Sequence, residues 1–419
     1  MKRIWKFFTS LKLTVVLLAL GIVLVFVGTV AQADEGLYQA QARYFKHWWV
    51  FGITFFGHHV PLPLPGGYLL GTALLINLTA AHIQRFQWTW KRIGIHLTHT
   101  GIVILLVGQL TTDLFSNETM MRFSESETKN YSESSRHYEL VFTTDAGDGA
   151  EDVISIPEWL LARGGEIKSG QLLFTIRVKK FWINSEPSFR APMQQNAPPL
   201  TTNGLAQHFD FHPSPEIKTM DDRNIPTALI EIVTPNVSLG EWVASDWAGE
   251  EALASSAANS LARHLGVPQM AERIANRLVE PQTIQVGGKT FTFTIRPERT
   301  YRPYSLTLLK FTHEVYPGTA TSANSEGIPK DFRSRVRLEN PQTGEDREVE
   351  IYMNTPLRYK GETFYQASFD KFDPRVSILE VVRNPGWLTP YAGCIIVALG
   401  LVTQFMIHLV GFISKRKNA

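Results

Sequence analysis

Cysteine is almost absent from this chain of 419 residues, because Cys394 is the only one. An intrachain disulfide framework, a cysteine-rich zinc site and a CxxC redox motif are therefore excluded. Charge is also scarce: Asp, Glu, Lys and Arg make up 19% of the residues, against roughly 25% in an ordinary soluble domain. Neither sign dominates, with 41 basic and 39 acidic side chains, which argues against a nucleic-acid partner bound through a basic surface.

The charge content is low because a few long apolar runs carry almost no charged residues. We predict transmembrane helices at about 13–33, 68–84, 93–112 and 387–412. Each run is close to the roughly 20 residues needed to cross about 30 Å of hydrocarbon. The first run ends in small residues, so a cleaved signal peptide is the alternative there. We expect the run to be retained, because it is longer than the apolar part of a usual signal peptide.

The segment 47–57 (HWWVFGITFFG) is apolar and aromatic but too short to span a bilayer. Aromatic side chains are enriched at membrane–water boundaries. We therefore expect a re-entrant or interfacial segment. Three prolines follow within five residues, at 61, 63 and 65, and they cannot continue a helix.

The distribution of basic residues predicts the orientation. Lys and Arg precede the first run, lie between the second and third, and follow the fourth in the tail 413–419. The positive-inside rule then places both termini in the cytoplasm and residues 113–386 on the outer face. The N-terminus runs directly into an apolar run, with no transit peptide, so we expect a multi-pass protein of a bacterial plasma membrane rather than of a plastid.

The segment 113–386 has the patterns of a β-rich domain. Alternating apolar and polar residues at 138–144, 172–183, 228–234 and 291–297 predict antiparallel strands, in a sandwich or a pair of β-subdomains. An Ala-rich stretch at 251–279, broken at Gly266, predicts a helical hairpin inserted between strands. Residues 184–226 are rich in Pro, Asn and Ser and are expected to form a long loop. The predicted fold class is thus an α+β membrane protein, with three N-terminal helices, one C-terminal helix and an antiparallel β-rich outer domain.

Histidines within the apolar runs are the candidates for chemistry. His96 and His99 are three residues apart and lie on one helix face. A neutral imidazole can donate a lone pair to iron, and a polar group at membrane depth is costly without a partner. His82 and His408, at the ends of their runs, are expected near the same side. The alternative is that all four are polar residues at a wet interface.

Small and amide side chains in the runs suggest helix packing. Asn77, Gln109 and Gln404 could form hydrogen bonds between helices, and Gly101 and Gly108 would allow close approach. In the segment 113–386 we recognise no nucleophile with its base, no phosphate loop and no carboxylate pair. We therefore assign no catalytic residues.

Several sequence motifs resemble a known family, the ResB (CcsB) proteins of cytochrome c biogenesis. The strongest match is YMNTPLRYKGETFYQASFD at 352–370, just before the last apolar run. Further matches are SLKLTVVLLAL at 10–20, INLTAAHIQRF at 76–86, HLTHTGIVILLVGQL at 96–110 and NPGWLTPYAG at 384–393. Both ends of the chain show the resemblance, whereas residues 184–275 do not. The Pro-rich break before the second run departs from the family pattern.

The resemblance implies a function in the System II pathway. Proteins of this family form a complex with a ResC (CcsA) type membrane partner. The complex moves haem b, which is bound transiently, to the outer face for attachment to the CxxCH motifs of apocytochrome c. The chain would be a subunit of this haem lyase without catalytic activity of its own. A thioredoxin-like thiol reductant is a further expected partner.

The same resemblance implies a ligand for the haem iron. A histidine of the third span is an axial ligand in this family, and the pattern T-H-x-G-I assigns that role to His99, with His96 as the alternate. Two other functions remain open. One is a b-type cytochrome that transfers electrons, which the clustering of histidines on one side disfavours. The other is a membrane-anchored scaffold for cytochrome assembly that binds no cofactor.

Overall fold

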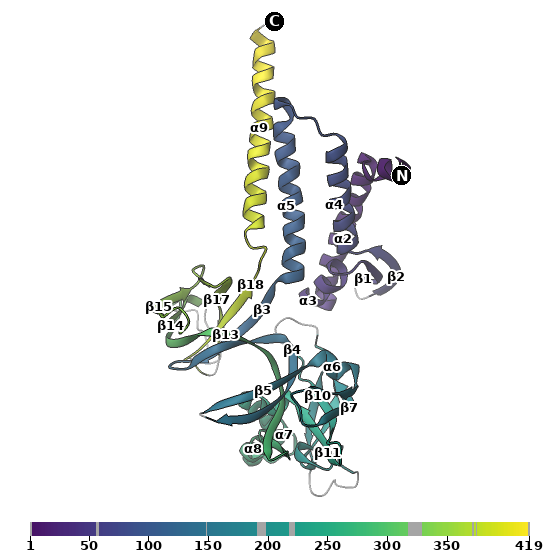
Figure 1. Ribbon diagram of the computed structural model, residues 1–419. Coiled ribbons are helices and arrows are strands. Elements are labelled where there is room, and N and C mark those ends of the chain that lie inside the picture. Colours follow the sequence, from purple (N-terminus) through teal and green to yellow (C-terminus); the bar gives the residue numbers. More distant parts are fainter. Residues whose placement is uncertain are drawn as a thin grey trace.

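The computed structural model of the chain describes residues 2–417, apart from 56–57, 148, 191–197, 218–222, 317–328, 371–372 and 374. Long helices lie side by side at one end of the molecule, and a large β-rich part occupies the other (Figure 1). The long helices are α2 (Leu11–Glu35), α4 (Gly67–Gln84), α5 (Ile93–Phe115) and α9 (Thr389–Lys417), with the short α1 (Lys2–Phe8) before them. This confirms the predicted α+β class, with three apolar helices before the β-rich domain and one after it.

Three stretches of the described residues are helical, long and apolar enough to cross a membrane: 11–35, 90–115 and 389–416. They indicate a membrane protein. Helix α4, which has 18 residues and includes polar side chains, is not among them. At 1.5 Å per residue it extends for about 27 Å. The structure therefore supports three spans by composition, one fewer than the sequence predicts.

The aromatic segment after α2 forms a β-hairpin. The chain passes through α3 (Leu37–Ala40) and the π-helical turn η1 (Gln41–Phe45) into β1 (Trp49–Phe55), which pairs with β2 (His58–Pro65). The three prolines lie in β2, a strand that pairs on one edge only, where a missing N–H is tolerated. Residues 56 and 57 of the predicted re-entrant segment lie outside the described residues.

Helices α5 and α9 pack through glycines spaced seven residues apart. Gly94, Gly101 and Gly108 on α5 face backbone and side-chain atoms of α9. A Cβ atom added at Gly101 would lie 2.6 Å from Val397 and 2.8 Å from the carbonyl oxygen of Gly393. The prediction that Gly101 and Gly108 allow close packing is confirmed. Small residues at an interface permit this backbone contact between helices.

The main sheet of the β-rich domain has ten strands, in the order β15-β14-β13-β4-β3-β18-β17-β16, with β5 beside β4 and β12 beside β13. All its pairs are antiparallel. The bounds are β3 Asn117–Ser124, β4 Thr128–Gly147, β5 Ala150–Pro157, β12 Gln282–Val286, β13 Lys289–Val315, β14 Pro329–Asn340, β15 Glu345–Tyr352, β16 Leu357–Tyr359, β17 Glu362–Phe369 and β18 Val376–Arg383. Strand β13 spans 27 residues and takes part in two apolar cores.

A second sheet has the order β11-β10-β7-β6 and packs on the β4, β5, β12 and β13 part of the main sheet. Its strands are β6 Gly165–Ile167, β7 Thr175–Trp182, β10 Thr227–Val233 and β11 Ser238–Ser245, with α6 (Glu158–Arg163) before β6. Helices α7 (Glu251–His264) and α8 (Ala271–Leu278) lie where the sequence predicts a helical hairpin. The expected loop at 184–226 is wrong in part, because β8 (Ser185–Phe189) pairs with β9 (Phe209–Pro213) and buries Phe209 and Phe211.

The helices and the β-rich domain are joined by paired strands. Strand β3 continues directly from α5, and β18 leads into α9 (Figure 1). The two strands pair antiparallel from Asn117 opposite Arg383 to Ser124 opposite Val376. The packing of α5 on α9 is therefore continued by a two-stranded connection, which constrains the domain relative to the helices.

Candidate functional site

Three histidines meet between α4 and α5. The ring centroids of His82 and His96 lie 5.0 Å apart in an edge-to-face arrangement, and those of His82 and His99 lie 5.3 Å apart in a stacked one. His82 is near the end of α4, whereas His96 and His99 are in the first two turns of α5. The spacing of three residues places the α5 histidines on the face toward α4.

The hydrogen bonds of the two α5 histidines indicate which ring nitrogen is free. Nε2 of His96 donates to the carbonyl oxygen of Gln87 at 2.8 Å, so in the neutral ring the lone pair is on Nδ1. That Nδ1 is buried and has no partner among the described residues. Nδ1 of His99 donates to the carbonyl oxygen of Ile95 at 2.8 Å, one helical turn earlier. The lone pair of His99 is therefore on Nε2, the nitrogen farther from the helix backbone.

Aromatic side chains extend the histidine group toward the short loop between α4 and α5. The ring of Phe86 lies 4.7 Å from that of His96 and 6.2 Å from that of Trp88. Trp88 and Trp90 are 79% and 85% exposed, and a cavity of about 120 Å³ lies between them and His96. The structure thus brings Trp88 into the aromatic group.

His408 does not join this group. Its Nε2 accepts a hydrogen bond at 3.0 Å from the side-chain amide of Gln404. The same amide nitrogen donates at 3.3 Å to the carbonyl oxygen of Lys91, so Gln404 connects α9 to the segment before α5 rather than to a neighbouring helix. Within the described ranges no three His, Cys, Asp or Glu side chains are arranged to hold a metal ion. A neutral imidazole of the histidine group can offer one nitrogen ligand to a metal ion.

Cationic side chains lie close to the histidine group in the sequence. The guanidinium group of Arg85 donates to the carbonyl oxygen of Thr9 at 3.3 Å, which connects the end of α4 to the region before α2. Lys91 and Arg92 are exposed at the start of α5. These side chains can interact with anionic groups at this end of the helices.

A second polar group lies at the opposite end of α4 and α5. Asp113, near the C-terminus of α5, accepts hydrogen bonds from the Tyr68 hydroxyl and, at 2.8 Å, from the Lys46 ammonium group. The sequence analysis missed this group. Its sequence signal was weak, because Asp113 is the first acidic residue after a long apolar run but its two partners are distant in the chain.

The segment 352–370, which carries the strongest family motif, has a structural role. Lys360 and Gly361 adopt positive φ angles of 50° and 83° and form the turn between β16 and β17. Glu362 then accepts two hydrogen bonds from Arg302, at 2.7 and 2.9 Å, and one from Tyr304. Arg302 and Glu362 line a cavity of about 510 Å³ that also touches Phe115 at the end of α5 and Pro385 before α9.

Two comparisons relate the chain to known proteins. Residues 277–376, from the end of α8 to the start of β18, match the model of the ResB-like family. Protein NrfI of Wolinella succinogenes is 33% identical over 128 residues, which make up 30% of this chain and 13% of NrfI. The chain thus matches only a small part of that relative. The segment that matches the ResB-like family holds the β16–β17 turn and the Glu362 cluster, so the similarity to this family covers that part of the β-rich domain.

Proposed function

We propose that the chain is the ResB subunit of a membrane cytochrome c synthase, which carries haem b across the membrane for attachment to apocytochrome c. The match of residues 277–376 to the ResB-like family and the similarity to NrfI support a role in cytochrome c biogenesis. The observation that carries the finer proposal is the histidine pair at the start of α5, of which one imidazole has a free outer nitrogen.

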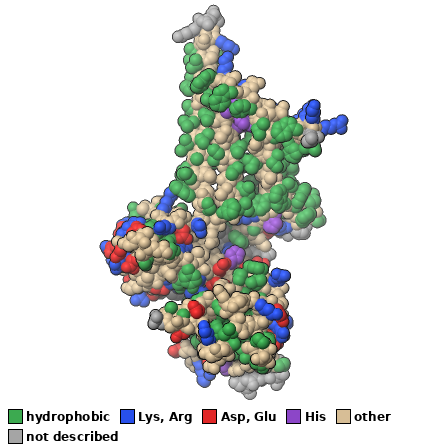
Figure 2. Space-filling view, in the orientation of Figure 1, with side chains coloured by type: hydrophobic (Ala, Val, Ile, Leu, Met, Phe, Trp, Pro, Cys, Tyr) green, Lys and Arg blue, Asp and Glu red, His purple; other side chains and the backbone are tan. Residues whose placement is uncertain are grey.

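The helices α2, α4, α5 and α9 would lie in a bacterial plasma membrane, with both termini in the cytoplasm. Basic residues precede α2, follow α4 and end α9, as the positive-inside rule requires. Figure 2 shows hydrophobic side chains covering the helical part, whereas the β-rich part carries mixed charges. The β-rich domain, at the other end of the helices from the histidine group, would then lie on the outer face.

His99 is the better of the two candidate ligands. Its Nδ1–H is held by the Ile95 carbonyl, a hydrogen bond of the kind that fixes the tautomer of an iron-bound imidazole. Its free Nε2 is the outer nitrogen of the ring. The free nitrogen of His96 is Nδ1, which lies next to the backbone and is buried, so a porphyrin ring would meet the helix before its iron reached that atom.

The other residues of the group have supporting roles. His82 stacks on His99 and limits the positions that the ligand ring can adopt. Phe86 and Trp88 offer apolar surface to a flat porphyrin, and Lys91 and Arg92 offer positive charge to its propionates. Bound haem supplies the iron and the vinyl groups to which the cysteines of apocytochrome c are joined. A ResC-type partner would supply the remaining iron ligand, and a thioredoxin-like protein would keep the cysteines reduced.

The test is to purify the full chain with its ResC-type partner and to measure the visible spectrum and the haem content. The variants are His99→Ala, His96→Ala and, as a matched control, His264→Ala, which removes an exposed histidine at the end of α7. We expect haem to be retained in the wild type, in His264→Ala and in His96→Ala, and to be lost in His99→Ala. Added imidazole should restore binding to the cavity that His99→Ala leaves.

Two results would contradict the proposal. If all variants retained the haem spectrum of the wild type, His99 would not be a ligand, and the chain would act as a scaffold for its partner. If deletion of the gene left all c-type cytochromes intact, the role in their assembly would be wrong, whatever the chain binds.

A further inference from the structure

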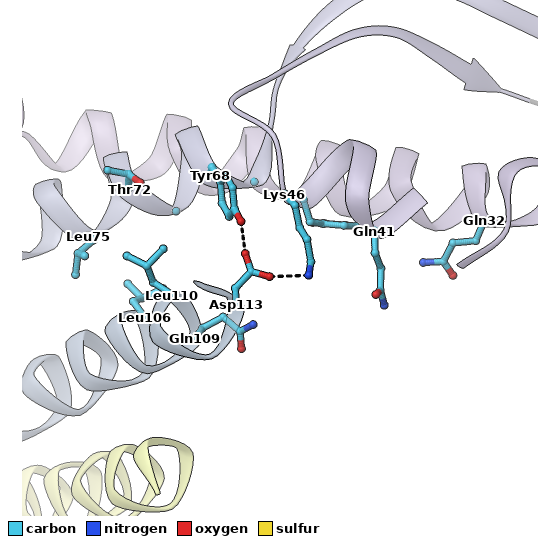
Figure 3. Close-up of a pocket in the computed structure, with 13 residues that line it drawn as sticks. Gln32, Gln41, Lys46, Tyr68, Thr72, Leu75, Leu106, Gln109, Leu110 and Asp113 are labelled. Carbon is cyan, nitrogen blue, oxygen red and sulfur yellow. Dashed lines mark hydrogen bonds and ion pairs between the residues drawn. The ribbon is translucent and has the colours of Figure 1, made fainter. Parts of the chain in front are cut away.

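A large cavity lies between the helices at the end near the β-rich domain, away from the histidine group. It has a volume of about 510 Å³, opens to the surface and is lined by residues of α2, η1, α4 and α5. Figure 3 shows Lys46, Tyr68 and Asp113 directed toward one another at its centre, with leucines of α4 and α5 on one side. The cavity thus has a polar part and an apolar part.

The polar part carries both signs of charge. Asp113 accepts hydrogen bonds from Lys46, at 2.8 Å, and from the hydroxyl group of Tyr68. The Asp113 side chain is 11% exposed and that of Lys46 is 53% exposed. The amides of Gln32, Gln41 and Gln109 complete the polar lining. The net formal charge of these groups is zero.

The apolar part lies deeper along the helices. It is formed by Leu75 of α4 and by Leu106 and Leu110 of α5. Leu106 precedes Asp113 by seven residues, which places it about 10 Å farther along the helix axis at 1.5 Å per residue. A Cβ atom at Gly71, which also lines the cavity, would meet nothing within 4 Å. The cavity therefore offers free volume next to the leucines.

A ligand that fits this arrangement has a polar head and an apolar body. The head must suit a carboxylate and an ammonium group that lie side by side. Two anionic groups, such as the propionates of haem, would place a negative charge against Asp113. A head with one cation and one anion can pair with both side chains, so charge complementarity selects a zwitterion.

We propose that this cavity binds a phospholipid with a phosphoethanolamine head group from the outer leaflet. The ammonium group of the lipid donates hydrogen bonds to Asp113, and its phosphate accepts from Lys46 and Tyr68. The acyl chains lie along Leu75, Leu106 and Leu110. This site rests on the membrane placement proposed above and is independent of haem binding.

The test is lipid retention by the full chain extracted from membranes in a mild detergent. Native mass spectrometry would be recorded after addition of phosphatidylethanolamine, phosphatidylcholine or phosphatidylglycerol at equal concentration. We expect the wild type to retain phosphatidylethanolamine best, because choline cannot donate a hydrogen bond to Asp113 and glycerol carries no cation. Asp113→Asn should reduce this retention by at least about fivefold, as the loss of a charge-assisted hydrogen bond predicts.

A second variant keeps the test decisive if Asp113→Asn does not fold. Leu106→Trp fills the apolar part and leaves the ion pair of Asp113 intact, so it should also lose the lipid. Lys415→Gln, at the exposed end of α9, is the control and should behave as the wild type.

Three outcomes would overturn the proposal. The first is that the wild type retains the three lipids equally. The second is that Leu106→Trp retains as much lipid as the wild type. The third is that the wild type holds haem instead of lipid, and that Asp113→Asn loses this haem. Failure of the lipid site is distinguishable from failure of the membrane placement, because the latter would leave the wild type out of the membrane fraction.

Discussion

Gly101 of α5 and Gly393 of α9 lie so close together that neither has room for a side chain. A Cβ atom at Gly101 would lie 2.8 Å from the carbonyl oxygen of Gly393, and one at Gly393 would lie 3.1 Å from the carbonyl oxygen of Gly101. The two backbones are therefore in direct contact. Because β3 and β18 continue from these helices, this contact also affects how the β-rich domain is attached.

Substitution of Gly101 by Ala should destabilise the helical part. The added methyl group overlaps Val397 and the α9 backbone, and overpacking of this kind costs about 1–3 kcal/mol. The measurement is the unfolding temperature of the detergent-solubilised protein. Gly411→Ala is the control, since a Cβ there meets nothing within 4 Å and Ala favours the helix. Equal unfolding temperatures for the two variants would show that α5 and α9 do not pack this closely.

Removal of the Asn77 side chain should loosen α4 from the N-terminal helices. Asn77 is fully buried, accepts a hydrogen bond from Thr14 at 2.6 Å and donates to the carbonyl oxygen of Phe8 at 2.7 Å. Asn77→Ala removes both of these buried hydrogen bonds, at a cost of about 1–3 kcal/mol. A double-mutant cycle with Thr14→Val checks the cause. The double variant should lose less stability than the two single variants lose together. Strictly additive losses would rule out direct coupling between the two side chains.

Asp246 should make the stability of the β-rich domain depend on pH. Its side chain is fully buried, and both of its oxygens lack a hydrogen-bond partner among the described residues. Burial raises its pKa to about 7, although the Arg223 guanidinium group, 3.8 Å away, opposes this shift. Between its ordinary pKa and about 7 the folded protein holds a proton that the unfolded chain releases. Stability therefore falls as the pH rises through this range.

Asp246→Asn tests this dependence. Asn cannot ionise, so the decline in the free energy of unfolding between about pH 4 and pH 7, on the order of a few kcal/mol, should disappear. The measurement is chemical unfolding followed by tryptophan fluorescence across that range. Asp346→Asn is the control, because the pKa of this exposed carboxyl is lowered by Arg337 and its contribution is lost only at lower pH. A pH dependence that is unchanged in Asp246→Asn would exclude Asp246 as its source.

Glu362→Gln should strongly destabilise the part of the β-rich domain nearest the helices. The side chains of Arg302 and Glu362 are 4% and 12% exposed, so the substitution leaves an unpaired buried guanidinium group. Breaking a buried ion pair from one side costs about 3–5 kcal/mol. Limited proteolysis and the unfolding temperature would measure the effect. Glu348→Gln removes an exposed partner of Arg335 and should have little effect, and a similar loss in both variants would contradict this role for Glu362.

The sequence predicted the local elements well, because their causes are local. Runs such as 11–35 and 389–416 are apolar over a helix length, and alternation at 291–297 specifies part of β13. It did not predict the β8–β9 pair in the region 184–226. Each of these strands is only five residues long, too short for a clear alternating pattern. Their pairing depends instead on the burial of Phe209 against α7 and α8.

The candidate sites divide in the same way. The sequence by itself determined that His96 and His99 share one helix face, because their spacing of three residues fixes this in any α-helix. It also determined that a single cysteine can form no intrachain disulfide and that apolar runs flank a charged domain in the sequence. Only the tertiary structure decided that His82 meets both histidines and that Asp113 binds Lys46 and Tyr68. These contacts join residues that are distant in the chain, and they form only when helix packing brings separate faces together.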